Sequence, residues 1–481
     1  MLLDAAATEI ERDPRASLQR IAIAAGLGRT TLHRHFPTRT DLVRALEQRA
    51  RLELAEGEPV EAARSPLRAQ AEGVLISAPS AASELTRAEL GQMRPPGQLG
   101  REQPLAVDAT HVLNEVPPHL VADQLVAEAR RVAAVPVALY VADIDGSRLV
   151  RLAGSDEFPL EIGGALAVGP EIAPDAIPDL WVTLESELPG CVPAPLWVRG
   201  RAIGVLIAVG PPRVSLADIA RQGTLALELA TAYTDVFEMA RRRRPTSPAA
   251  EIQLNLLPPR HARMAGAEVS GSLLPSYDVG GDWFDYVENR DGAWLAIADA
   301  SGKGATSAAL ASIALGALRA ARRSGFELEQ AAISMDRVVS EVGDASFSLS
   351  AIVARWHAPT STFDWINCGH RLPLLVAVDG TLQSLHGRSC PPFGRARAGQ
   401  EYRRESRRLA RGERIVLYTD GISERRTADG GFFGLEGIER VLAELAGAPA
   451  AAIVRALQDA VVQASPEPLD DDAAIIVLAV A

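Results

Sequence analysis

The sequence predicts a multidomain α+β protein: an N-terminal helical bundle, a central α/β unit, and a C-terminal sandwich in which two β-sheets lie between helix layers. Its 481 residues suggest about three units, because single domains usually have about 100 to 200 residues. Helix-spaced apolar residues dominate the beginning of the chain, whereas short strand-like runs alternate with long helices near its end. The breaks between these regions fall at Pro95-Pro96-Gly97 and at the arginine run 241–244.

Composition narrows the classes of partner. The net charge of -12 disfavours a protein that wraps nucleic acid, so any contact with DNA is expected to be local. Cys191, Cys368 and Cys390 lack Cys-x-x-Cys spacing, which indicates neither a disulfide framework nor a zinc site. The N-terminus shows no signal-peptide pattern, and the apolar run at 308–321 is too short and polar to span a bilayer. We therefore expect a cytoplasmic protein with no membrane partner.

The first unit, residues 1–53, has the pattern of four short helices. Ser17 can cap the second helix, and the tight turn Gly26-Leu27-Gly28 separates it from a third helix at 29–36. Two short helices joined in this way form a helix-turn-helix, whose second helix can enter the major groove of DNA.

The run Ile21-Ala-x-x-Ala-Gly-Leu-Gly-Arg-Thr-Thr-Leu-His-Arg-His-Phe36 resembles the DNA-binding domain of TetR-type repressors. The resemblance implies that five side chains face DNA: Arg29, Thr30, Thr31, His33 and Arg34. His33 stands where the family usually has Tyr, and a basic arm before the first helix is missing. The alternative is a helical bundle that serves dimerisation or regulation.

A helical linker at 54–101 leads to the second unit, residues 102–240. Its predicted elements are a helix, a strand, a hairpin folded about Arg199-Gly200-Arg201 and a long helix, at 120–134, 135–141, 194–209 and 215–237. This order resembles a GAF sensory domain. The resemblance implies a pocket for a small ligand of unknown identity, or a dimerisation module, and we expect a homodimer.

The linker 241–249 has four arginines beside two prolines, which is typical of a solvated connection. It joins the long helix of the second unit to an apolar helical segment at 251–257. Rotation or ordering of this linker could therefore transmit a signal into the last unit.

The last unit, residues 250–481, mixes many strands with a few long helices. The predicted strands are 267–274, 283–288, 294–298, 348–356, 361–367, 372–378, 414–418 and 474–480. The predicted helices are 305–323, 328–342, 435–446 and 450–464. Such a set predicts a two-sheet core covered by helix layers.

Acidic residues recur where the predicted strands of this unit begin or end: Asp282, Asp299, Asp420 and Asp471. Two carboxylates about 4 Å apart repel by roughly 4 kcal/mol at an effective dielectric constant of about 20, so a cluster of them needs cations. An all-oxygen set favours Mg²⁺ or Mn²⁺ over zinc. A pair of such ions can activate a shared water and clamp phosphoryl oxygens, which suits hydrolysis of a phosphate ester.

An ordered set of motifs resembles the SpoIIE-like, RsbU-type branch of the metal-dependent type 2C protein phosphatases. The motifs are Leu256-Leu-Pro258, Val279-Gly-Gly-Asp282, Asp299-x-Ser-Gly-Lys-Gly304, Asn367-x-Gly-His370, Thr419-Asp-Gly421 and Asp471-Asp472. The resemblance implies two Mn²⁺ or Mg²⁺ ions, with Asp299 bridging both. Asp282 and the backbone carbonyl of Ala300 would complete one ion's site, and Asp420 and Asp471 the other.

The same resemblance implies that a metal-activated water attacks phosphoserine or phosphothreonine without a covalent enzyme intermediate. The usual substrate in this family is a phosphorylated anti-sigma factor antagonist. Ala298, Cys368 and Ala474 replace the usual Gly, Ala and Thr of the motifs, but none of these changes removes a metal carboxylate, so we expect activity. Asn367 and His370 either shape the site or stabilise a turn.

The sequence thus predicts a phosphatase gated by its sensor domain. The alternative is a DNA-binding transcriptional regulator in which the phosphatase domain is a scaffold or is weakly active.

Overall fold

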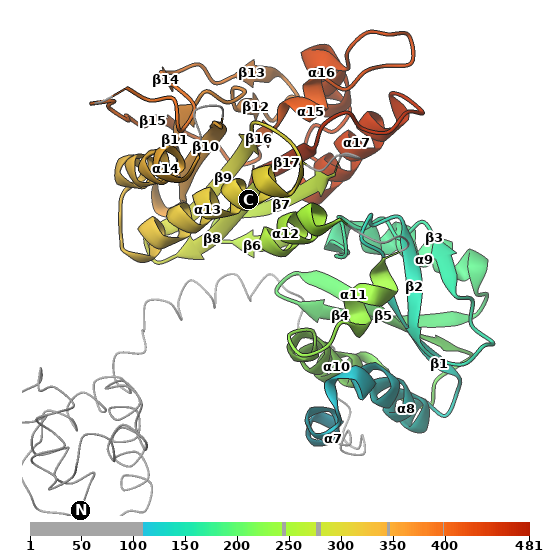
Figure 1. The fold of residues 1–481 in the computed structure, drawn as a ribbon. Helices are drawn as coiled ribbons and strands as arrows, with labels where there is room; N and C mark the ends of the chain where they lie inside the picture. The colour runs from blue at the N-terminus through green and yellow to red at the C-terminus, as the bar shows by residue number, and fades with distance from the viewer. Residues whose placement is uncertain (1–108, 243–246, 276–279, 344–346, 398) are drawn as a thin grey trace, which may run out of the picture. The chain divides into compact units, whose positions relative to one another are not determined.

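The computed structural model describes residues 109–481 except 243–246, 276–279, 344–346 and 398 (Figure 1). The chain divides into two compact units, Met1–Pro104 and Leu105–Ala481, and only the second is described below. The predictions for 1–53 and 54–101 fall outside the described residues.

The N-terminal part of the described unit is built on a five-stranded antiparallel sheet in the order β3-β2-β1-β5-β4. Its strands are β1 (Val137–Ala142), β2 (Arg148–Ala153), β3 (Glu161–Gly163), β4 (Cys191–Val198) and β5 (Arg201–Val209). One face packs against α7 (Ala109–Glu115), α8 (Val121–Ala133) and α10 (Ala217–Ala230). The other face packs against η2 (Pro174–Ala176) and α9 (Ile177–Glu187).

The predicted hairpin of this part is present, and its turn places Arg199 and Gly200 at φ 44° and 86°. The predicted long helix at 215–237 is wrong, because α10 ends at Ala230 and a separate helix, α11 (Val236–Arg241), follows. Threonine side chains explain the break: the Thr231 hydroxyl donates to the carbonyl of Glu228, and the Thr234 hydroxyl accepts from the amide of Val236. The sequence pattern missed β2, β3, α7 and α9.

The C-terminal part contains two six-stranded sheets. In the first, the order is β14-β11-β10-β9-β8, with β15 paired to β11. Its strands are β8 (Trp283–Asn289), β9 (Gly292–Ala300), β10 (Leu349–His357), β11 (Thr362–Cys368), β14 (Ser389–Cys390) and β15 (Glu405–Arg408). In the second, the order is β13-β12-β16-β17-β7-β6. Its strands are β6 (His261–Met264), β7 (Ala267–Leu274), β12 (Leu374–Val376), β13 (Leu382–Ser384), β16 (Arg414–Tyr418) and β17 (Ala473–Val480).

Three buried clusters define four layers (Figure 1). Helices α13 (Gly304–Arg323) and α14 (Leu328–Val342) cover the first sheet. The two sheets meet in a cluster that includes Phe284, Trp356 and Ile476. Helices α16 (Gly434–Ala443) and α17 (Ala450–Gln463) cover the second sheet. The predicted helix-sheet-sheet-helix sandwich is therefore the observed architecture of this part.

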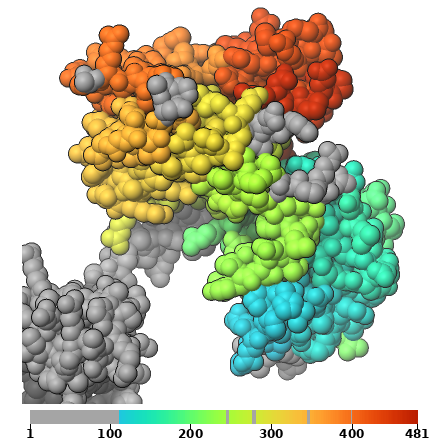
Figure 2. Space-filling view, in the orientation of Figure 1, coloured from blue at the N-terminus to red at the C-terminus, as the bar shows by residue number. Residues whose placement is uncertain are grey.

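All eight predicted strands and four predicted helices of this part are present, with ends shifted by up to three residues. The pattern missed β6, β13, β14, β15 and the short helix α15 (Asp420–Ser423). It did anticipate α12 (Pro248–Leu256), which follows the predicted linker. Figure 2 shows the segment from α11 to β6, in light green, between the blue-green five-stranded part and the yellow body of the sandwich.

Helix α13 contains the apolar run 308–321, which was expected to be too short and polar to span a membrane. Among the described helices it alone is long and apolar enough, by length and composition only, to do so. The helix packs against α14 and the first sheet through a buried cluster that includes Ala311, Ala314, Leu315 and Leu318. One face of this helix is therefore packed inside the protein.

Candidate functional site

Strand pairing brings the predicted aspartates to one end of the sandwich. Asp282 directly precedes β8 and Asp299 is the last but one residue of β9, and these antiparallel strands pair Trp283 with Ala298. Asp420 begins α15 just after β16, and Asp471 lies just before β17, whose Ile475 pairs with Tyr418.

The four carboxylates interact electrostatically across the two sheets. Burial and then the neighbouring Asp299 and Asp472 raise the pKa of Asp282 well above its usual value, while a hydrogen bond with Thr419 lowers it. Burial, followed by Asp420 and Asp471, raises the pKa of Asp299 to about 7. Such mutual repulsion between acids in a confined space is what a bound cation relieves.

The pKa values of the two acids from the second sheet are also raised. For Asp420 the causes are burial and then Glu424, opposed by Arg371. For Asp471 the main cause is burial, opposed by a hydrogen bond from the amide of Asp472 and by the charge of Lys303. Lys303 also donates its Nζ to the carbonyl of Asp470, which places the chain's one lysine at this end of the sandwich.

Asp282 carries the clearest mark of a cation site. Its side chain is 3% exposed, and its Oδ2 has no hydrogen-bond partner. A buried carboxylate oxygen without a partner is costly unless a cation or donor reaches it. The all-oxygen donor set at this end fits Mg²⁺ or Mn²⁺. Among the described residues, however, no three acidic, histidine or cysteine side chains already form a metal-binding group.

Two glycines let backbone segments approach at this end. A Cβ at Gly421 would lie 2.0 Å from the carbonyl oxygen of Asp472, which leaves no room for any side chain. A Cβ at Gly281 would lie 2.6 Å from the Cβ of Ala300, at the end of β9. The glycines of the Gly-Gly-Asp and Thr-Asp-Gly motifs therefore allow Asp282 and Asp420 to come near their partners.

Two residues of this end were missed as site residues. Asp472 is 1% exposed, whereas Asp471 is exposed. The Asp472 Oδ2 accepts a hydrogen bond from the amide of Gly280 at 2.9 Å. The buried Gln253 of α12 donates its Nε2 to the same Oδ2 at 2.5 Å and to the carbonyl of Asp282 at 2.9 Å. Strand alternation carries the signal for Asp472, because even-numbered residues of β17 such as Ala474 and Ile476 face the space between the sheets. Nothing in the local pattern singles out Gln253.

Asn367 and His370 are close to each other. The Asn367 side chain donates to the carbonyl of His370 at 3.0 Å and accepts from its amide at 2.8 Å, so it closes the turn after β11. The His370 Nδ1 lies 2.6 Å from the Ser350 hydroxyl, and Ser350 pairs with Asp299 across β10 and β9. Burial lowers the pKa of His370 to about 3, which keeps the ring neutral. These contacts favour the turn-stabilising role for Asn367.

Comparisons with known proteins find matches to the C-terminal part of the chain and to its first unit. Residues 289–481 match the family model described as stage II sporulation protein E (SpoIIE), and residues 2–46 match that of the bacterial regulatory proteins of the tetR family. Over 231 residues the chain is 25% identical to the phosphoserine phosphatase RsbU of Bacillus subtilis (strain 168), covering 48% of this chain and 68% of that protein.

Two further matches cover a smaller share of the matched protein. Over 45 residues the chain is 56% identical to the HTH-type transcriptional repressor LfrR of Mycolicibacterium smegmatis, covering 9% of this chain and 24% of the repressor. The solved structure of the RsbU and RsbW domains of Rv1364c from Mycobacterium tuberculosis aligns with a TM-score of 0.39 at 26% identity, covering 45% of this chain and 60% of that chain. The chain thus spans about a quarter of the repressor and less than two thirds of the mycobacterial structure.

Proposed function

We propose that this chain, which carries a SpoIIE-type protein serine/threonine phosphatase domain and a TetR-type helix-turn-helix module, dephosphorylates a signalling protein in a metal-dependent reaction. The substrate would be a phosphoserine or phosphothreonine of an anti-sigma factor antagonist. The observation that carries the proposal is the gathering of Asp282, Asp299, Asp420 and Asp471 at one end of the sandwich.

The proposed ligand set follows from this grouping. Asp299 would bridge two Mn²⁺ or Mg²⁺ ions, with Asp282 and the carbonyl of Ala300 on one ion and Asp420 and Asp471 on the other. Two such ions, when bound, supply the charge that makes a water nucleophilic near neutral pH and neutralises the phosphoryl oxygens. The unpartnered Oδ2 of Asp282 supports this assignment.

The chain's own residues position the ligands. Gln253 and the amide of Gly280 hold the Asp472 carboxylate, whose charge acts on Asp282, and the amide of Asp472 donates to the Asp471 Oδ1. Arg371 forms an ion pair with Glu424, and its Nη2 lies 3.9 Å from the Asp420 Oδ2. This half-exposed guanidinium limits the negative charge that an incoming phosphoprotein meets at the site.

Gating by the N-terminal part is proposed from contacts with α12 and β6. The amides of Arg260 and His261 donate to the Glu171 Oε2 at 2.7 and 3.1 Å. Glu171 belongs to the predicted GAF-like region, and Arg260 lies between β6 and α12, the helix that carries Gln253. A shift of the sensor would therefore reach the carboxylate end through one short helix. We place the protein in the cytoplasm as a homodimer, with an unidentified small ligand on the GAF-like region.

The test is release of phosphate from a phosphoserine protein with Mn²⁺ present. The wild-type chain should release it, and Asp299→Asn should abolish release while the melting temperature is kept. Activity retained by Asp299→Asn would refute the proposal.

A second function is proposed on the match of residues 2–46 to the tetR family. The chain would bind a specific DNA sequence through residues 1–53, with Arg29, Thr30, Thr31, His33 and Arg34 facing the DNA. Selection from a genomic DNA library followed by a gel shift tests it, with Arg34→Ala as the control. Failure to enrich any sequence would eliminate this function.

A further inference from the structure

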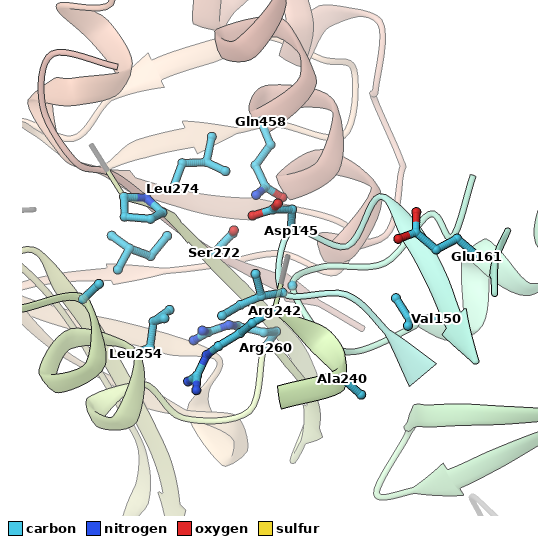
Figure 3. Close-up of a pocket in the computed structure, with 15 residues that line it drawn as sticks. Asp145, Val150, Glu161, Ala240, Arg242, Leu254, Arg260, Ser272, Leu274 and Gln458 are labelled. Atoms are coloured by element: carbon cyan, nitrogen blue, oxygen red, sulfur yellow. The ribbon is translucent and has the colours of Figure 1, made fainter. Parts of the chain in front are cut away.

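A cavity of about 860 Å³ lies beside α12 (Figure 3). Its volume is within the range of about 300 to 1,000 Å³ that is usual for small-molecule sites. Apolar side chains from three elements line it, namely Val150 of β2, Leu254 of α12 and Leu274 of β7. Its polar groups come from Arg242, Arg260, Ser272 and Gln458, and the carboxylates of Asp145 and Glu161 also line it.

Arg260 is the unusual member of this lining. The residue is 8% exposed, and its guanidinium makes one hydrogen bond within the described structure, from Nη1 to the carbonyl of Pro258 at 3.5 Å. The guanidinium carbon also lies 5.6 Å from the centre of the Phe284 ring. No carboxylate of the described residues forms an ion pair with it. A buried charge that is compensated so weakly costs folding free energy.

Arg201, which lies nearby on β5, differs from Arg260 in its ion pairs, although its Nε also lacks a hydrogen-bond partner. It is 6% exposed and pairs with Glu171 at 3.0 Å and with Glu228 at 2.9 Å. The charges of Glu171 and Glu238 act on Arg260. The Glu171 carboxylate is occupied by Arg201 and by two backbone amides, and Glu238 pairs with Arg241 and Arg242. Arg260 therefore has no carboxylate of its own, although Arg201 has two.

A second guanidinium on the cavity is also incompletely bonded. Arg242 pairs through its Nη2 with Glu238 and Glu251, at 3.3 and 3.0 Å. Its Nε is buried and has no hydrogen-bond partner. The cavity thus combines apolar walls and two carboxylates, Asp145 and Glu161, with two arginines whose hydrogen-bond donors are not all used.

We propose that this cavity binds a small organic anion, whose carboxylate or phosphate group is held by Arg260 and whose apolar body contacts Val150, Leu254 and Leu274. Arginine suits both groups because its planar guanidinium can donate two parallel hydrogen bonds to two oxygens. The ligand would lie against α12, whose Gln253 contacts Asp282 and Asp472. Its effect on activity rests on the proposed phosphatase function, whereas its binding does not.

The test is isothermal titration of the full chain with benzoate and, separately, with phenylphosphonate. These probes share an aromatic body and differ in the anionic group, so the tighter one identifies the group that the site prefers. Loss of the charged contact in Arg260→Gln should weaken binding about tenfold or more, since such contacts contribute roughly 1.5 to 3 kcal/mol. Arg263→Gln, an exposed change three residues away, should leave the affinity unchanged.

Binding that is equal in wild type and Arg260→Gln would overturn the proposal, and it would place the phenylphosphonate elsewhere, for example at the carboxylate end. Absence of binding by both probes would overturn it as well. If the melting temperature shows that Arg260→Gln is unfolded, Val150→Phe decides the matter, because it fills the cavity and leaves Arg260 in place. Binding should be lost in this variant, and retained binding contradicts the proposal. No substrate is present, so a failure of the phosphatase proposal would not affect the result.

Discussion

Two buried aspartates three residues apart, at the start of β8, have opposite surroundings. Asp285 is 2% exposed and pairs with Arg319 at 2.8 Å and Arg322 at 2.9 Å, both from α13. Asp282 is 3% exposed, yet its neighbours are Asp299 and Asp472, and its Oδ2 has no partner. Burial alone therefore does not distinguish the two acids. The distinguishing feature is that the fold supplies no countercharge to Asp282, a cost that proteins tolerate mainly at functional sites.

The comparison is most sharply tested by removing the charge of Asp282. Asp282→Asn should lower metal-dependent phosphatase activity on the order of a thousandfold, because a metal ligand contributes several kcal/mol of transition-state stabilisation. Its metal-free melting temperature should stay equal or rise, since a repulsion is removed. Initial rates with Mn²⁺ and differential scanning calorimetry measure the two effects. A large fall in melting temperature together with normal activity would reverse the roles assigned to the two acids.

Asp285→Asn should lower stability and leave phosphatase activity unchanged. It leaves Arg322, whose side chain is 7% exposed, without its partner, so unfolding free energy should fall by about 3 to 5 kcal/mol. Activity per folded molecule should be unchanged. Urea denaturation provides the measurement, with Asp364→Asn on β11 as a control that should change stability by less than about 0.5 kcal/mol. A stable Asp285→Asn protein would show that the arginine pair is not needed.

Gln253→Ala tests the contact between α12 and the carboxylate end. Loss of its hydrogen bonds to Asp472 and Asp282 should lower the apparent Mn²⁺ affinity about 10-fold to 100-fold, the usual effect of removing a residue that orients metal ligands. Asn255→Ala, on the exposed side of the same helix, should leave it unaltered. Activity measured against Mn²⁺ concentration distinguishes the two variants, and identical curves would show that Gln253 does not support metal binding.

The smallest expected effect concerns pH. The pKa of Asp299 rises from 3.8 to about 7 on folding, so the folded state keeps a proton that the unfolded state releases. The metal-free protein should therefore lose stability as pH rises from about 4 to about 7. Asp282, Asp420 and Asp471 shift in the same direction. Melting temperatures in a chelating buffer should fall over this range, less so in Asp299→Asn; a rise would contradict the electrostatic description of this end.

The sequence anticipated the sandwich well because its strands are short apolar runs between turns, and because the motif aspartates stand beside them. Contacts between residues far apart in the sequence could not be predicted in this way. Gln253 lies 219 residues from Asp472, and no local periodicity links them. The break after α10 was missed because the apolar spacing continues through Tyr233, whereas threonine side chains end the helix. Asp472 was missed because it is one of three consecutive aspartates. Which of them is buried depends on which face of β17 packs between the sheets.

The acids from four strand ends are proposed to hold divalent cations. Anomalous diffraction from crystals of the protein grown with Mn²⁺ tests it most directly. Two anomalous peaks are expected, enclosed by Asp282, Asp299, Asp420 and Asp471. Crystals of active protein that show no peak at this end of the sandwich, or peaks only elsewhere, would contradict it.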